Sequence, residues 1–191
     1  MDGKLIYYNK VDGNSYKFCF DPLCSNVYPE GKCPYVMIAP TPLASTIVYC
    51  EKNARFYAAR GQKICSMGFD AGEIKTECSL GEDGNLNSVD YDRNYIKNLR
   101  CAGDYLFFLY KDDVTGHNKL MRYSIKKGDL VPLTSAENEW MIGYEIADGY
   151  IFCKMLDENN NIVFYTADYD FDNLHIVSDP INPNSFGSSM G

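Results

Sequence analysis

The chain has 191 residues, of which 46% are hydrophobic and 23% are charged, and this balance excludes an intrinsically disordered protein. Its formal net charge of −8 offers no basic surface to a phosphate backbone, so we expect no nucleic-acid partner. The longest apolar runs fall far short of the roughly 20 residues of a membrane-spanning helix, so we expect no membrane insertion.

Four segments share one pattern, in which a strand-like run, a turn of Gly, Asp or Asn, and a second short run follow one another. In chain order these segments are 4–20, 63–80, 119–134 and 161–178. The last two also have a matching aromatic run upstream, at 103–113 and 148–158. For the second segment we assign the upstream run to 45–53.

The individual runs have the features of strands. Each is four to seven residues long, is bounded by turn-forming residues and partly alternates; in "LMRYSI", Leu120 and Arg122 fall on one face and Met121 on the other. The 16 Tyr and 10 Phe favour pleated sheets, and no long run has helical periodicity. The sequence therefore predicts an all-β protein.

The spacing of the runs indicates how the strands are grouped. Tyr105 and Tyr150 begin equivalent aromatic phrases 45 residues apart, which is the length of a β-propeller blade of three or four antiparallel strands. Stacking such sheets face to face buries aromatic residues that one sheet alone leaves exposed. We predict an antiparallel β-propeller-like stack of about four blades, with a β-sandwich as the alternative.

The recurrence predicts one domain, 1–178, followed by a tail, 179–191, whose Pro, Asn, Gly and Ser residues indicate a loop or disorder. Within the domain the units lie at about 1–35, 36–80, 95–134 and 138–178. The insertion 81–94 is predicted to be a surface loop. Because open blade edges need a partner, we expect a missing segment, closure of a small ring, or self-association.

The stretch "CFDPLCSNVYPEGKCP" places Cys19, Cys24 and Cys33 in the connector after the first hairpin. Three roles stay open for them. They are weak candidates for a metal site, since structural zinc sites favour closer cysteine pairs and four ligands. They could form a disulfide, which an exported protein favours, or they could be buried thiols.

We interpret the cysteines in apolar strand runs as buried thiols that behave as small hydrophobic residues. They are Cys50, Cys65, Cys101 and Cys153. A catalytic cysteine needs a histidine partner, but His117 lies in a turn sequence where a solvated side chain is expected, and His175 lies in another unit. We therefore predict no catalytic residue and no cofactor.

The acidic run "ADYDFDNLHIVSD" spaces Asp168, Asp170 and Asp172 as in a calcium-binding loop, with Asp179 at the twelfth position. Its sixth position is Asn173, where such loops have Gly. Because the run aligns with turns in the other units, we interpret it as a hairpin turn.

A second acidic pair, Asp90 and Asp92, would share one face of an extended segment, as a glycosidase carboxylate pair requires. We interpret both as solvated loop residues, because no matching partner is identifiable across a cleft. Trp140 lies in the connector between the third and fourth units. We interpret it as an anchor between blades, with an exposed contact residue as the alternative.

The phrase "CFDPLC", followed by "CP" and preceded by "KLIYYNKVDGNSYKF", resembles a motif of uncharacterised bacterial β-propeller-like repeat proteins, many of them exported or lipid-anchored. Their motif reads Cys-x-Asp-Pro-x-Cys-x-His and then Cys-Pro, and this chain has Asn26 in place of the histidine. The resemblance implies a propeller-like fold and an extracellular or cell-envelope location, if a leader lies outside the sequence. A cytoplasmic location is the alternative.

Repeats without a catalytic set of residues predict a non-enzymatic binding module that presents a propeller face to a protein or a glycan. The sequence does not identify the ligand or the residues that bind it. Two alternatives stay open: a polysaccharide-active lyase or hydrolase on a propeller scaffold, and a structural fragment that assembles with itself.

Overall fold

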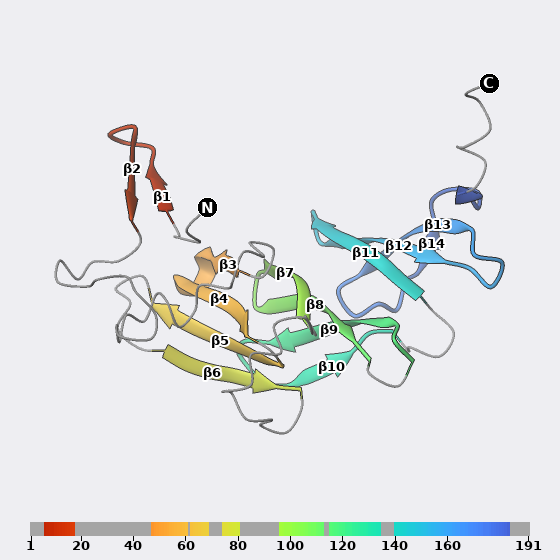
Figure 1. Cartoon of the computed structure of the whole chain (residues 1–191), viewed down its shortest axis with the longest axis horizontal. Coiled ribbons are helices and arrows are strands. Elements are labelled where there is room, and N and C mark those ends of the chain that lie inside the picture. Colours follow the sequence, from red (N-terminus) through yellow and green to blue (C-terminus); the bar gives the residue numbers. More distant parts are fainter. Residues whose placement is uncertain are drawn as a thin grey trace. The chain divides into compact units, whose positions relative to one another are not determined.

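The computed structural model describes residues 6–17, 47–60, 62–68, 74–80, 96–112, 115–134 and 140–183. In these ranges the elements with defined bounds are antiparallel strands and the 3-10 helical turn η2 (Glu51–Asn53) (Figure 1). The prediction of an all-β fold is confirmed. No helix in the described ranges has the length and apolar character needed to span a lipid bilayer.

The chain divides into two compact units, Met1–Gly103 and Asp104–Gly191. The described strands of the first unit are β1 (Ile6–Asn9), β2 (Asn14–Lys17), β3 (Ile47–Cys50), β4 (Arg55–Arg60), β5 (Lys63–Gly68), β6 (Ile74–Ser79) and β7 (Ile96–Ala102). Strands β1 and β2 form a hairpin, and β3 to β6 form a four-stranded sheet in which each strand pairs with its neighbour in sequence.

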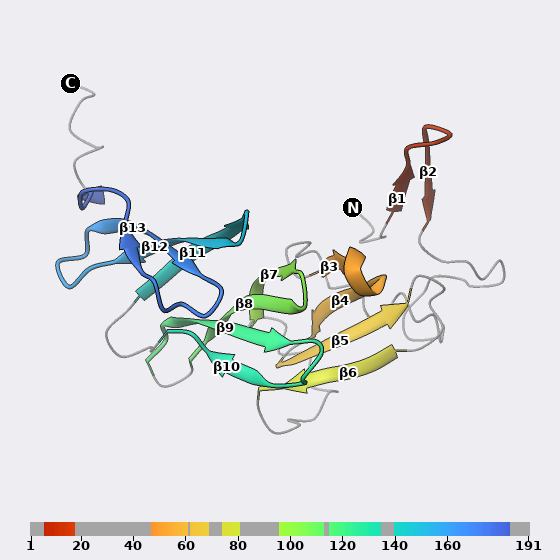
Figure 2. The ribbon, with the colours of Figure 1, turned by 180° about the vertical axis from the view of Figure 1, so that it is seen from behind.

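The second unit repeats this meander. Its described strands are β8 (Tyr105–Lys111), β9 (Asn118–Ser124), β10 (Leu130–Pro132), β11 (Trp140–Ala147), β12 (Tyr150–Leu156), β13 (Ile162–Asp168) and β14 (His175–Ile176) (Figure 2). Strands β11 to β14 pair in sequence order, and the preceding sheet has the order β10-β9-β8-β7. The described residues thus contain three antiparallel four-stranded sheets, the architecture expected of blades.

The recurrence of 45 residues has a structural meaning. Tyr105 and Tyr150 are the first residues of β8 and β12, each the second strand of its sheet. The turn before Tyr150 consists of Asp148 and Gly149, both with positive φ (51° and 86°), which is the two-residue hairpin turn that suits twisted strands. The four predicted hairpins are confirmed, whereas the grouping of all units into one domain, 1–178, stays a prediction.

Strands β4 and β11 lie where no strand was predicted, and β7 was indicated only by the apolar run that contains Cys101. The assignment of 45–53 as the counterpart of 103–113 and 148–158 is wrong, because β3 opens its sheet and β4 takes the second position. Trp140, which was predicted to lie in a connector, is the first residue of strand β11. A bulge between Met141 and Gly143 interrupts its alternation, so Met141 and Tyr144 are both buried although they lie three residues apart.

The hairpin turns use aspartate side chains as local hydrogen-bond acceptors. Asp157 accepts from the backbone N–H of Asn159 and Asn161, at 2.9 and 2.8 Å. Asp168 accepts from the backbone N–H of Asp172 at 3.0 Å and from the Asn173 side-chain amide at 2.6 Å. The interpretation of the run "ADYDFDNLHIVSD" as a hairpin turn is therefore confirmed.

These turns predict a pH dependence of stability. The backbone N–H donors, from Asn161 to Asp157 and from Asp172 to Asp168, lower the pKa of each carboxyl below the usual value for Asp. A lowered folded-state pKa means that the stabilisation is present above the unfolded-state pKa of about 3.9 and is lost as pH falls through the folded-state pKa.

We therefore expect the difference in urea midpoint between the parent chain and the double variant Asp157→Asn, Asp168→Asn to be larger at pH 7 than at pH 2.5. Fluorescence of Trp140, the sole tryptophan, reports on the unit that contains both turns. Asparagine keeps an acceptor oxygen but does not titrate, so an equal difference at both pH values would contradict the assignment.

Candidate functional site

The sheet β11–β14 has two apolar faces, one buried and one exposed. On the buried face, Ile151, Cys153 and Met155 of β12 are at most 4% exposed. Tyr150 and Phe152 alternate with them and are 54% and 46% exposed. Because alternate residues of a strand point to opposite faces, both aromatic side chains belong to the second face.

Cross-strand register identifies the other residues of this second face. Phe152 lies opposite Glu145 of β11 and Thr166 of β13, and Lys154 lies opposite Phe164. The Val177 N–H donates to the Phe164 carbonyl at 2.8 Å, which places these two residues side by side. The exposed apolar members, 38% to 59% exposed, define what we call the exposed aromatic face: Trp140, Tyr150, Phe152, Phe164 and Val177.

Trp140 is held in place at one end of this face. Its indole stacks on the His117 imidazole, with ring centroids 4.7 Å apart and an interplanar angle of 13°. The next residue is also fixed, because the Asn118 side-chain amide donates to the Met141 carbonyl at 3.2 Å. Trp140 is nevertheless 43% exposed, so it serves as an anchor between two sheets and as a surface residue at once.

The structure corrects the interpretation of His117. This side chain was expected to be solvated, but it is half-buried because it supports the indole of Trp140. His175, by contrast, is exposed on β14, where its register opposite Thr166 places it on the same side of the sheet as Phe152.

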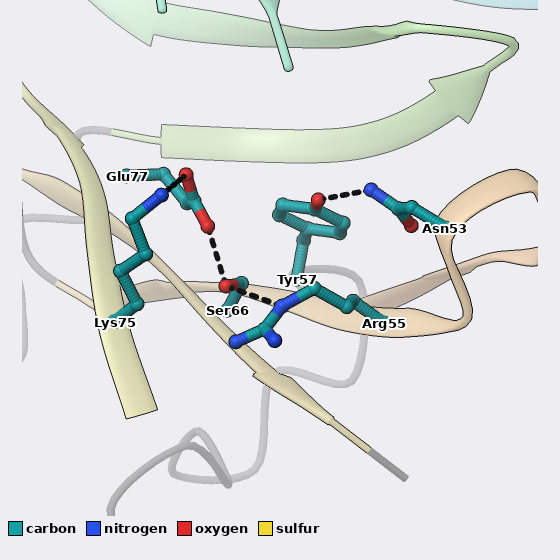
Figure 3. A network of polar contacts seen from close by, with 6 residues as sticks. All are labelled: Asn53, Arg55, Tyr57, Ser66, Lys75 and Glu77. Atoms are coloured by element: carbon teal, nitrogen blue, oxygen red, sulfur yellow. Dashed lines mark hydrogen bonds and ion pairs between the residues drawn. The ribbon is translucent and has the colours of Figure 1, made fainter. Parts of the chain in front are cut away.

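The first unit contains a network of polar side chains across β4, β5 and β6 (Figure 3). The Ser66 hydroxyl donates to Glu77 Oε1 at 2.5 Å and accepts from Arg55 Nε at 3.0 Å. Lys75 Nζ lies 3.2 Å from the other oxygen of Glu77. Ser66 is fully buried and both its partners are charged, so the network acts as a structural tie between three strands rather than as a nucleophile with a base.

Two further groups of this sheet have raised pKa values. Burial raises the pKa of the Tyr57 phenol, whose oxygen accepts from the Asn53 side-chain amide at 2.5 Å. Burial also raises the pKa of the Cys78 thiol to about 11. Cys78 is therefore protonated near neutral pH and is a poor nucleophile.

A disulfide joins Cys50 at the end of β3 to Cys101 in β7, with a Cα–Cα distance of 5.7 Å. The interpretation of these two residues as buried thiols is wrong. Cys153 is a buried thiol, as expected, whereas Cys65 is a thiol of intermediate exposure. An open hollow of about 550 Å³ lies beside the disulfide and is lined by Tyr49, Cys50, Glu51, Lys52, Cys101 and Gly103.

Several predicted candidates lie outside the described residues. They are Cys19, Cys24 and Cys33 of the cysteine connector, together with Asp90 and Asp92. Their proposed roles as metal ligands, disulfide partners or loop residues stay predictions. Within the described part of the chain, no three His, Cys, Asp or Glu side chains are grouped closely enough to hold a metal ion.

The exposed aromatic face was not predicted, although the sequence contains a signal for it. The β12 run "YIFCKML" has Lys154 as its one polar residue, so both of its faces are apolar. A strand with one solvated face alternates apolar and polar residues, and a strand with two covered faces does not. The run therefore indicated a sheet built to be covered on both sides.

A scan against family models and a search of curated proteins each returned no match. Among solved structures, the chain is similar to TolB from Acinetobacter baumannii, with a TM-score of 0.57, 12% identity, and coverage of 92% of this chain and 37% of that chain. It also matches the N-terminal domain of Nup159 with a TM-score of 0.48, 10% identity, and coverage of 74% of this chain and 32% of that chain.

The sheets and the likeness to TolB define the class of the protein as all-β and propeller-like. The likeness to TolB, at 12% identity, establishes the fold alone. The chain spans about a third of the length of both solved structures.

Proposed function

We propose that this chain is a non-enzymatic interaction module and that the exposed aromatic face binds a protein. The observation that carries the proposal is the contrast within one sheet, whose inner face is buried while Tyr150 and Phe152 on the other face are about half exposed. Exposed apolar groups that gather on one regular surface mark interaction sites.

The composition of the face supports a protein ligand. Aromatic residues such as Trp140 and Phe152 are enriched in protein interfaces, and the charged residues Glu145 and Lys154 beside them supply polar contacts. The stack on His117 restricts the Trp140 indole before binding, which lowers the entropic cost of ordering it in a complex.

Photo-crosslinking tests this proposal. Replacing Tyr150 with p-benzoylphenylalanine should give a discrete protein adduct in an extract of the source organism, and the change Phe152→Asp should reduce that adduct at least about tenfold. The same crosslinker at Val11, which is 95% exposed in the β1–β2 turn, is the matched control.

Other results of these experiments would contradict protein binding by this face. A Tyr150 adduct that persists in the Phe152→Asp variant, or none at all, would remove the face as a protein-binding site. If the intact chain binds a glycan array and Phe152→Asp abolishes that binding, the ligand is a glycan instead. The absence of both activities would favour the scaffold of an enzyme or a purely structural fragment.

We also propose an extracellular or cell-envelope location. The disulfide between Cys50 and Cys101 supports it, because disulfides persist mainly in oxidising compartments. Intact mass of the protein from its native source, with and without thiol alkylation, tests the location through the redox state of these two cysteines. If both cysteines are alkylated without prior reduction, the location is a reducing one.

A further inference from the structure

Strands β8 and β12 occupy equivalent places in two successive sheets, and their surroundings differ. Phe107 of β8 and Phe152 of β12 are both the third residue of their strand and lie 45 residues apart. Phe107 is 0% exposed, whereas Phe152 is 46% exposed. The same position is thus covered in one sheet and open in the next.

The residues that cover Phe107 come from the following sheet. The Tyr169 ring, in the turn between β13 and β14, lies 5.2 Å from the Phe107 ring. Arg122 fixes this contact, since its guanidinium donates to the Tyr169 carbonyl at 2.8 Å and lies 4.9 Å from the Tyr105 ring centroid. A sheet of this type is therefore completed by the sheet that packs on it.

We propose that the exposed aromatic face docks against the same face of a second copy of this chain. The inference rests on the proposed function and names the protein that is bound. In a second copy the inner face of β11–β14 is already filled, with Ile151 and Met155 at most 4% exposed. The open apolar face of that sheet is the exposed aromatic face itself, so the contact is isologous, with one surface used by both copies.

The size of the face suits a dimer of moderate affinity. An aromatic side chain carries about 150–250 Å² of surface, so four rings at about half exposure contribute roughly 350 Å². The remaining residues of the face are Val177, Glu145, Lys154, Thr166 and His175. With them the surface approaches the roughly 800 Å² per partner of a standard interface.

The charges of the face are compatible with a two-fold contact. Glu145 lies opposite Phe152, and Lys154 is the next residue of β12 on the same side. A two-fold axis that passes beside Phe152 in the plane of the interface, at right angles to the diagonal between Glu145 and Lys154 and through its midpoint, brings Glu145 of one copy over the partner's Lys154, so opposite charges meet twice. The net charge of −8 on each copy opposes this association at long range, and salt should therefore strengthen it.

Sedimentation equilibrium of the purified chain at 0.15 M salt tests the proposal. As the protein concentration rises, we expect the measured mass to increase from that of one chain to that of two chains, with a Kd of about 1–100 µM. The emission of Trp140, which lies on the face, should shift to shorter wavelength in parallel. Phe152→Asp should raise the Kd at least about tenfold, because a buried, unpaired carboxylate is costly, whereas Val11→Asp should leave it unchanged.

A charge exchange gives a second test that does not depend on the Phe152 variant. Glu145→Lys or Lys154→Glu alone should weaken association, and the two together should restore it. The proposal is overturned if the mass is that of one chain at every concentration, or if the Phe152→Asp and Val11→Asp variants associate equally. If the chain stays single and Tyr150 crosslinks to another protein, the dimer is refuted and the interaction module stands.

Discussion

Replacing both Cys50 and Cys101 with serine should lower the free energy of unfolding of the unit Met1–Gly103 by about 4 kcal/mol. The disulfide closes a loop with a sequence separation of 51 residues. In the chain-entropy description, such a crosslink acts mainly by restricting the unfolded chain, and the effect grows with loop length. Urea denaturation followed by far-UV circular dichroism, with and without the substitutions, measures the change.

Reduction of the parent chain provides the matching control. Dithiothreitol should lower the unfolding midpoint of the parent chain at least to that of the untreated double serine variant, and it should lower the midpoint of the variant by less than that of the parent chain. Cys65→Ser, which removes a thiol without breaking the crosslink, controls for the loss of sulfur. A parent chain whose midpoint does not respond to reductant contradicts the assignment.

The sequence predicted the features that depend on neighbouring residues. Alternation within runs such as "LMRYSI" located β9, and Asp-rich turns located the hairpins. The 45-residue spacing of Tyr105 and Tyr150 identified equivalent strands, because a repeated sheet places repeated residues in repeated positions. Alternation and turn residues extend over a few positions, and the spacing extends over one repeat, so all of these patterns are visible in the sequence.

The features that the sequence did not reveal depend on local irregularity or on distant contacts. Strand β11 was missed because the bulge at Met141 and Gly143 removes its alternation. The pairing of Cys50 with Cys101 was missed because two strands meet that lie far apart in the sequence, and composition cannot indicate which cysteines meet. Both errors concern first strands of a sheet.

The candidate site illustrates a different limit. Phe107 and Phe152 have the same strand position and follow the similar pairs Tyr-Leu and Tyr-Ile, yet one is buried and one is exposed. The difference arises from whether a following sheet packs on each strand, as Tyr169 does on Phe107. The sequence pattern therefore contains a signal for side chains that need a cover, and the structure was required to show which of them has one.

Removing the Glu77 carboxylate should lower the free energy of unfolding of the unit Met1–Gly103 by about 3 kcal/mol. This is the second largest effect that we expect. The Glu77 side chain is only 5% exposed, and it holds the buried Ser66 hydroxyl and the Lys75 ammonium together. Glu77→Ala would leave Ser66 and the Arg55 guanidinium, which donates to Ser66, without the negative charge that balances them. Urea denaturation followed by circular dichroism measures the loss.

Two matched variants separate charge from packing in this network. Lys75→Ala removes the exposed end of the network, where the lysine is 60% exposed, and should cost less than about 0.5 kcal/mol. Glu77→Gln keeps an acceptor for the Ser66 hydroxyl but not the charge, so its cost should lie between those of the other two variants. If Glu77→Ala costs no more than Lys75→Ala, the carboxylate is solvated, and the tie between β5 and β6 must come from the backbone ladder alone.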